Sequence, residues 1–168
     1  MNYLSTGDNH LRRMPCFLLG TYIVCPCENE SVKYIPVQLL KSGDCVYVGQ
    51  GRIGTIQRIY RVPLQTSISC PLADDLVVSY HQVCRKMMNR VSRKSHPWRV
   101  AGELMRIGRA PESHGYLIVL SGGESIVRTR EWECLTIGHG VADDPITADP
   151  YWSTPSPLYD LESFYITN

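Results

Sequence analysis

The sequence predicts an all-β protein made of short antiparallel strands and hairpins. Three observations lead to this prediction. The apolar runs are short, turn residues bound nearly every one of them, and the 11 prolines and 13 glycines are spread along all 168 residues. A sheet of this kind must hide its edges, so we expect it to curl and to pair strands that are distant in the sequence.

Charge and composition exclude several classes of protein. With 17 basic and 16 acidic residues the net charge is +1, so no whole-chain field favours nucleic acid or a membrane surface. No apolar run approaches the ~18 residues that span a bilayer, and the N-terminus lacks the pattern of a secretory signal. Seven irregularly spaced cysteines then favour reduced thiols over a disulfide framework. We expect a cytoplasmic protein that binds no membrane.

The first predicted strand covers residues 16–24 and begins at Cys16, which a Gly-Thr pair and an apolar run follow. Residues 1–15 are polar, and we interpret them as a leader. Pro15 delivers this leader in an extended conformation, because the residue before a proline is pushed out of the helical region. The first strand therefore opens the folded domain at a cysteine.

Two more thiols, Cys25 and Cys27, fall in the turn region that follows this strand. A Cys-x-Cys pair can hold a metal, but a four-ligand zinc site needs a second pair. The remaining cysteines stand singly, so we expect no metal site and no cofactor.

Turn residues separate the later predicted elements from one another. Residues 32–40 indicate a short strand and then a turn of helix, and residues 67–76 indicate a hairpin around an acidic pair. A period-two alternation or a continuous apolar run predicts the other strands. These are 45–48, 54–62, 76–83, 116–120, 125–129 and 132–137, with residues 98–108 as a short apolar segment closed by a glycine.

Two segments are not strand-like. Residues 85–99 hold six of the 17 basic residues. We interpret them as a solvated loop rather than a nucleic-acid site, because they lack the aromatic interleaving that single-strand binding wants. Residues 142–168 are rich in Asp, Pro, Thr and Ser, and we expect a C-terminal extension packed along the surface of a domain covering 16–141.

Four landmarks stand in a fixed order. They are Cys-Phe-x-x-Gly-Thr at 16–21, Leu-Lys-x-Gly-Asp-x-Val at 40–46, Val-Ser-Tyr-His-Gln-Val at 78–83 and Trp-x-x-Ala-x-Glu-Leu at 98–104. This set resembles the Hint domain, which hedgehog autoprocessing domains and inteins share. The later motifs Tyr-Leu-Ile-Val-Leu at 116–120, Cys-Leu-Thr-Ile-Gly-His-Gly at 134–140 and Asp-Pro-Tyr-Trp at 149–152 are similar to its Vint branch, found beside von Willebrand A domains.

The resemblance implies a flattened, horseshoe-like β-fold with the first cysteine in a central cleft. It also implies that Cys16 attacks the carbonyl of Pro15 in an N-to-S acyl shift, so that the substrate is the protein's own peptide bond. In the family the histidine of a Thr-x-x-His motif protonates the leaving nitrogen, and this histidine falls on His81. Water or another nucleophile then resolves the thioester in a single turnover.

Several residues depart from the family pattern. Val78 stands in place of the threonine of Thr-x-x-His. Ser79 is the available substitute, but strand alternation turns it to the opposite face. The rigid ring of Pro15 limits the twisting that acyl transfer uses, and Asp149 stands where relatives tend to have a histidine. Thr167 replaces the penultimate histidine of an intein, so we expect no splicing of this chain.

Other candidates keep two interpretations each. His81 is either the acid or a histidine satisfied at a strand end, and His139 is either a second acid or base or a structural turn residue. Thr136 is a candidate for the same cleft. Cys134 is a further cleft candidate, although a buried core thiol is the commoner meaning of such a cysteine.

Two functions from different classes remain open. The first is Hint-type autoprocessing at the bond between Pro15 and Cys16. The second is a Hint-fold module that does not cleave and binds a protein partner, since Vint relatives occur in multidomain proteins, some connected to ubiquitin pathways. The changes at Val78 and Pro15 favour the second, and whether the chain is an enzyme stays open.

Overall fold

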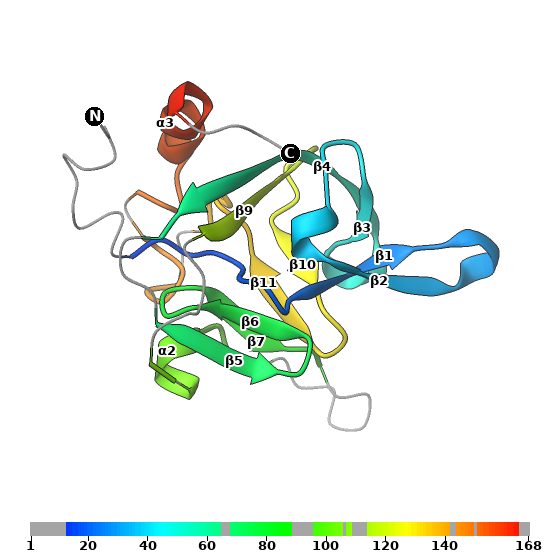
Figure 1. Cartoon of the computed structure of the whole chain (residues 1–168), viewed down its shortest axis with the longest axis horizontal. Helices are drawn as coiled ribbons and strands as arrows, with labels where there is room; N and C mark the ends of the chain where they lie inside the picture. Colours follow the sequence, from blue (N-terminus) through cyan, green and yellow to red (C-terminus); the bar gives the residue numbers. More distant parts are fainter. Residues whose placement is uncertain are drawn as a thin grey trace.

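The computed structural model describes residues 13–64, 68–88, 96–105, 107–108, 114–141, 144–149 and 151–164. Within these ranges short antiparallel strands in small sheets dominate, and helices are few (Figure 1). The all-β prediction is confirmed. Among the described residues no helix is both long and apolar enough to cross a membrane.

One sheet is built around the longest strand. Its order is β3 (Cys45–Tyr47), β4 (Ile53–Pro63) and β9 (His114–Leu120). The register between β4 and β9 shifts between Ile56 and Arg58, and such an irregularity bends a strand and increases its twist. Strand β4 can therefore pair with β3 at one end and with β9 along the rest of its length.

A second sheet joins strands from distant parts of the chain. Its order is β10 (Ile126–Arg128), β11 (Trp132–Leu135), β7 (Val83–Lys86) and β8 (Arg99–Val100). The short helix α2 (Ala101–Leu104) follows β8 directly. Strand β11 pairs with β7, which lies 48 residues earlier at Glu133 and Arg85, so the predicted pairing of distant strands is confirmed.

Two hairpins complete the β-structure. The hairpin of β5 (Ser69–Ala73) and β6 (Leu76–Ser79) lies beside α2, and that of β1 (Tyr22–Pro26) and β2 (Val32–Pro36) projects from the body of the molecule (Figure 1). Each strand of the second hairpin ends in a proline. Single turns of 3-10 helix lie at Glu28–Glu30, Val37–Leu39 and Gly49–Gly51.

The buried side chains form two clusters, one on each face of β9. Tyr116, Ile118 and Leu120 belong to the first cluster, and Leu117 and Val119 belong to the second. This period of two follows from the alternation of side chains along a strand. The same alternation runs through the start of the domain, where Phe17 lies in the first cluster while Cys16 and Leu18 lie in the second.

The C-terminal extension contains a helix that its composition does not predict. Residues Ser156–Phe164 form helix α3, and Trp152 and Leu161 are 2% and 0% exposed within the second cluster. The predicted leader also contributes to this cluster, through the buried side chain of Met14. Large apolar groups at both ends of the described chain thus complete one core.

Three local predictions are wrong. Strand β6 ends at Ser79, so His81 lies in a turn rather than near the end of a strand. Cys25 is part of β1 and is buried, because that face of the strand packs on the first cluster, whereas Cys27 is exposed as expected. Arg85 opens the predicted basic loop but lies in β7, and residues 89–95 of that segment lie outside the described residues.

Candidate functional site

The peptide around Cys16 lies between two strands that come from distant parts of the chain. Phe17 forms β-bridges to Val78 of β6 and to Tyr116 of β9. The backbone N–H of Ser79 also donates to the carbonyl of Cys16 at 3.0 Å. The first residues of the domain therefore pair with β6 on one side and β9 on the other, and Cys16 is fully buried there.

The Gly-Thr pair after Cys16 holds this segment in place. Gly20 has φ +97°, a left-handed conformation that glycine adopts without strain, and an added Cβ would lie 3.1 Å from Val77. The buried hydroxyl of Thr21 donates to the carbonyl of Val77 at 2.6 Å and accepts from its N–H at 3.0 Å. One side chain thus satisfies both backbone groups of a residue in β6.

The thiol of Cys16 is sealed in the second cluster. The residue is 0% exposed, and a Cβ added to Gly115 would lie 2.5 Å from its Sγ, so a glycine at that position makes room for the sulfur. Burial raises the pKa of the Cys16 thiol to about 12, although a contact with Ser79 offsets part of the rise. At neutral pH the group is therefore a thiol and not the thiolate that acts as nucleophile.

The hydroxyl of Ser79 binds the peptide on both sides of Pro15. Its Oγ accepts from the N–H of Cys16 at 3.0 Å and donates to the carbonyl of Met14 at 2.8 Å. Val78, one residue earlier, has its side chain in the first cluster. Ser79 therefore makes the polar contact to this peptide that Val78 does not make.

A cavity of about 80 Å³ lies on the other side of the peptide and has room for two or three water molecules. Five residues that the sequence analysis singled out line it together: Pro15, His81, Thr136, His139 and Asp149. Four others are not among its lining residues. Ser79 is one of them, Cys16 lies in the second cluster, and Val78 and Cys134 lie in the first.

Both histidines of this cavity are uncharged at neutral pH. Burial lowers the pKa of His81, the positive charge of Arg13 lowers it further, and the carboxylate of Asp149 acts in the opposite direction. Burial also lowers the pKa of His139, again against the effect of Asp149. Nδ1 of His139 accepts from the N–H of Val141 at 2.9 Å, so the proton of this neutral ring is on Nε2.

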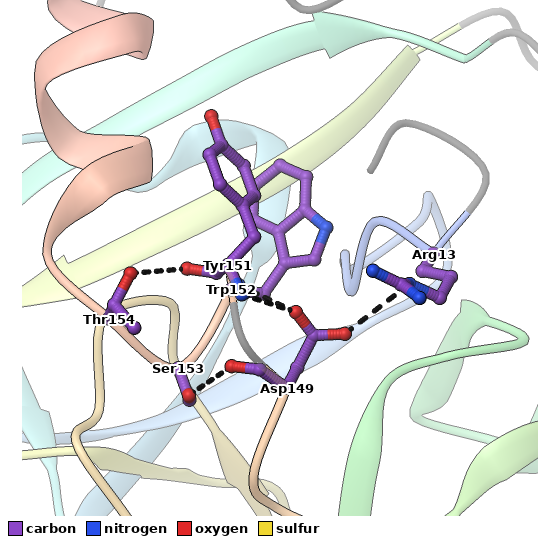
Figure 2. Close-up of polar contacts among 6 residues, drawn as sticks. All are labelled: Arg13, Asp149, Tyr151, Trp152, Ser153 and Thr154. Carbon is purple, nitrogen blue, oxygen red and sulfur yellow. Dashed lines mark hydrogen bonds and ion pairs between the residues drawn. The ribbon is translucent and has the colours of Figure 1, made fainter. Parts of the chain in front are cut away.

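Asp149 organises the loop that covers the cavity (Figure 2). Its Oδ1 accepts from the backbone N–H groups of Tyr151 and Trp152 at 2.8 and 2.9 Å, and its backbone carbonyl accepts from the hydroxyl of Ser153. Its Oδ2 forms an ion pair with Nε of Arg13 at 3.5 Å. The carboxylate therefore ties the residues before the Pro15–Cys16 bond to the C-terminal extension.

Sequence reasoning gave no role to Asp149, Arg13 or Gln82. Gln82 is 1% exposed, and its Nε2 donates to the carbonyls of Leu135 at 2.7 Å and Val83 at 3.1 Å, which fixes the turn that carries His81. A local signal existed for Asp149, because an aspartate before a turn commonly accepts from backbone N–H groups two residues later. Nothing local signalled the other two.

The two remaining candidates lie along one stretch of β11 and the residue that follows it. Thr136 is buried at the cavity wall, where its Oγ1 donates to the carbonyl of Ser125 at 3.2 Å. Cys134 pairs with Cys84 across the sheet, and burial raises the pKa of both thiols, to about 12 for Cys84. Within the described residues no group of three or more His, Cys, Asp or Glu side chains is arranged to hold a metal.

The fold and site together define an all-β protein with a sealed cysteine directly after a proline that lines a two-histidine cavity. No model of a known protein family matches the chain, and no curated protein is significantly similar to it. The likeness to Hint domains therefore rests on the sequence motifs, and it stays a prediction.

Proposed function

We propose that the chain is a self-cleaving domain of the Hint type, in which Cys16 attacks the carbonyl carbon of Pro15. The observation that supports this proposal best is the pair of hydrogen bonds made by the hydroxyl of Ser79, which accepts from the N–H of Cys16 at 3.0 Å and donates to the carbonyl of Met14 at 2.8 Å. The one peptide bond that the chemistry would break is thus fixed beside a cavity with two neutral histidines.

The proposed reaction exchanges an amide for a thioester. The thiol of Cys16 loses its proton, an Sγ–C bond forms at the carbonyl carbon of Pro15, and the C–N bond between Pro15 and Cys16 breaks. The leaving nitrogen takes up a proton and becomes the free α-amine of Cys16, so the proton count is unchanged. A neutral imidazole suits this transfer, because it can accept the proton and give it back, and we assign that part to His81.

Water completes the proposed cleavage. Addition of water to the thioester carbonyl gives the carboxylic acid of Pro15 and returns the thiol of Cys16. The 80 Å³ cavity that Pro15 lines is large enough to admit the water. Each chain would react once, on its own backbone. We further propose a cytosolic setting, because all seven cysteines are free thiols in the structure.

The sealed thiol sets a condition on this proposal. The sulfur packs at Gly115 in the second cluster, whereas Pro15 lines the histidine cavity. The side chain of Cys16 must therefore move before its sulfur and the histidines can act on the same bond. A slow reaction that a mild loosening of the fold accelerates is the expected behaviour.

Intact-mass measurement of the full chain tests the proposal. The chain is incubated at pH 7.5 with and without dithiothreitol or hydroxylamine, which both cleave thioesters. We expect a species that begins at Cys16, its loss in Cys16→Ala, and strong slowing in His81→Gln. His96→Gln is the matched control, since His96 does not line the cavity, and it should react like the wild type. A full-length chain that survives both reagents, also in 1 M urea, contradicts the proposal.

One observation favours a second function. A cysteine that is 0% exposed and has a pKa of about 12 is a poor nucleophile. A Hint-fold module that does not cleave and acts by binding a protein partner, as in multidomain relatives linked to ubiquitin pathways, would have this property. The same mass experiment separates the two functions, because this module stays intact under every condition.

A further inference from the structure

A second hollow, of about 360 Å³, opens over the sheet of β10, β11, β7 and β8. We call it the basic groove. It is defined here by Arg85, Lys86, Met88, His96, Arg128 and Glu133, and it shares no lining residue with the histidine cavity. Its volume lies within the range of about 300–1,000 Å³ that is typical of ligand sites.

Three charged residues form a row across the floor of the basic groove. Arg128 of β10 pairs in register with Glu133 of β11, and Glu133 pairs with Arg85 of β7. Directly paired residues of adjacent strands project from the same face. One carboxylate therefore lies between two guanidinium groups.

The carboxylate of Glu133 is bound to Arg85. Its Oε1 accepts from Nε of Arg85 at 3.0 Å, and the guanidinium of Arg85 also lies 4.0 Å from the ring centre of Trp98. The charge of Arg85 is thus compensated within the protein. Lys86, which is exposed, also lines the groove, and its ammonium lies 5.8 Å from the ring centre of Trp132.

Arg128, at the other end of the row, has a hydrogen-bond donor without an acceptor. Nε of Arg128 is buried and has no hydrogen-bond partner, and the guanidinium lies 6.0 Å from the ring centre of Tyr47. A buried N–H donor of a cation that has no acceptor carries a desolvation penalty. A carboxylate that entered the groove would compensate the charge of this guanidinium and would form a charge-assisted hydrogen bond with it.

The remaining lining identifies the kind of ligand. Met88 is 55% exposed and presents an apolar, adaptable side chain next to the cations. Nucleic acid would need free aromatic faces for its bases, but the ring of Trp98 is covered by Arg85 and Trp132 is only 7% exposed. An acidic peptide offers carboxylates for the cations of the groove and apolar side chains for Met88.

We propose that the basic groove binds an acidic segment of a partner protein, with a carboxylate at the guanidinium of Arg128 and an apolar side chain on Met88. This site is separate from the histidine cavity, and it does not depend on cleavage at Pro15. It would serve a self-cleaving domain and a non-cleaving module equally.

Binding is tested on the full Cys16→Ala chain, so that cleavage cannot interfere. The probe is a fluorescein-labelled nonapeptide of alternating glutamate and leucine, with a lysine–leucine peptide of the same length as its control. We expect the acidic peptide alone to raise the anisotropy and to shift the Nε–Hε signal of Arg128 in nitrogen–proton NMR spectra. Affinity should fall as salt is raised from 50 to 300 mM, because the contact is between charges.

Two variants locate the site. Arg128→Gln should weaken binding about tenfold, which corresponds to the loss of one charge-assisted hydrogen bond, while Lys41→Gln, an exposed cation elsewhere, should leave binding unchanged. Should Arg128→Gln fail to fold, the NMR shift in the parent chain still decides. An unmoved Arg128 signal, equal binding of the basic peptide, or binding of polyuridylate in preference to the acidic peptide would each overturn the proposal.

Discussion

The two residues of the Pro15–Cys16 peptide face opposite surroundings. Pro15 lines a small cavity with two uncharged histidines, and the side chain of Cys16 is packed among apolar groups of the second cluster. The histidines of the proposed acyl-transfer site therefore lie at Pro15, while the proposed nucleophile is buried in the core. Having suitable residues at one peptide bond is thus not the same as having them in a reactive arrangement.

Strand alternation explains the difference. The segment of Cys16 pairs with β6 and β9 as a strand would, so successive side chains point to opposite clusters. A rotation of the peptide around Cys16 would bring the sulfur toward the cavity, and the hydrogen bonds from Ser79 oppose that rotation. The hydrogen bonds of Ser79 that fix the Pro15–Cys16 peptide thus also keep the thiol of Cys16 buried.

Thiol reactivity gives the largest expected effect. With a pKa of about 12 instead of the ordinary 9.0, the thiolate fraction of Cys16 at pH 8 is about a thousandfold smaller. Iodoacetamide should therefore modify Cys16 at least that much more slowly than the exposed Cys27 and Cys45, as followed by peptide mass spectrometry. In 8 M urea the three rates should converge. Equal rates in the folded chain would show that the thiol is not sealed.

Removal of the Ser79 hydroxyl should cause the next largest change. Ser79→Ala leaves the N–H of Cys16 and the carbonyl of Met14 without partners in a buried site, which should lower the free energy of unfolding by about 3 kcal/mol. Urea denaturation measures the loss. Ser31→Ala, an exposed serine bonded to Glu28, is the matched control and should change stability by less than about 0.5 kcal/mol. An unchanged free energy of unfolding in Ser79→Ala would show that these two hydrogen bonds do not stabilise the fold.

The packing at the sulfur is tested by Gly115→Ala. The new Cβ would lie 2.5 Å from Sγ of Cys16, and such overpacking should cost about 2 kcal/mol of unfolding free energy. In a Cys16→Ala background the cost should shrink, because the sulfur is gone, so a double-mutant cycle isolates this contact. Gly49→Ala is the control, since its nearest neighbour is a flexible methyl of Ile126 at 3.3 Å. A cost that is equal in both backgrounds would place the strain elsewhere.

The two histidines of the cavity should give the smallest effect, which is a dependence of the free energy of unfolding on pH. The pKa values of His81 and His139 are lowered below 6.5 in the folded chain, so the unfolded chain binds protons first as the pH falls. Stability should therefore be full above 6.5 and should decline below it. The urea midpoints at pH 7.5 and 5.5 should lie closer together in His81→Gln than in the wild type or in Ser31→Ala. A larger difference between the two midpoints in His81→Gln than in the wild type would contradict the lowered pKa of His81.

Local patterns in the sequence predict the individual hairpins better than the way in which they assemble. The turn residues Asp74 and Asp75 correctly predict the hairpin of β5 and β6, and the apolar run at 116–120 predicts β9. The place of β7 between β11 and β8 has no local signal. Helix α3 was missed because two prolines, at 155 and 157, obscure its pattern, although proline is tolerated in the first turn of a helix.

The candidate site shows the same limit. Alternation correctly places Ser79 on the face opposite to Val78, but only the pairing with the segment of Cys16 decides which face meets the peptide. Arg13 and Asp149 are separated by most of the chain, and their ion pair follows from the packing of both ends on one core. Local residue patterns therefore indicate which residues are candidates for the site, and the long-range pairing of strands decides which of them lie in it.

The projecting hairpin of β1 and β2 has a consequence for self-association. A free two-stranded ribbon offers unpaired backbone groups to a neighbouring molecule, which is how sheets grow into aggregates. Here Pro26 and Pro36 end the two strands, and proline has no N–H to donate. The exposed Lys33 adds a charge that an incoming copy of the ribbon would have to approach. The projecting hairpin can therefore contact other chains without adding their strands to its sheet.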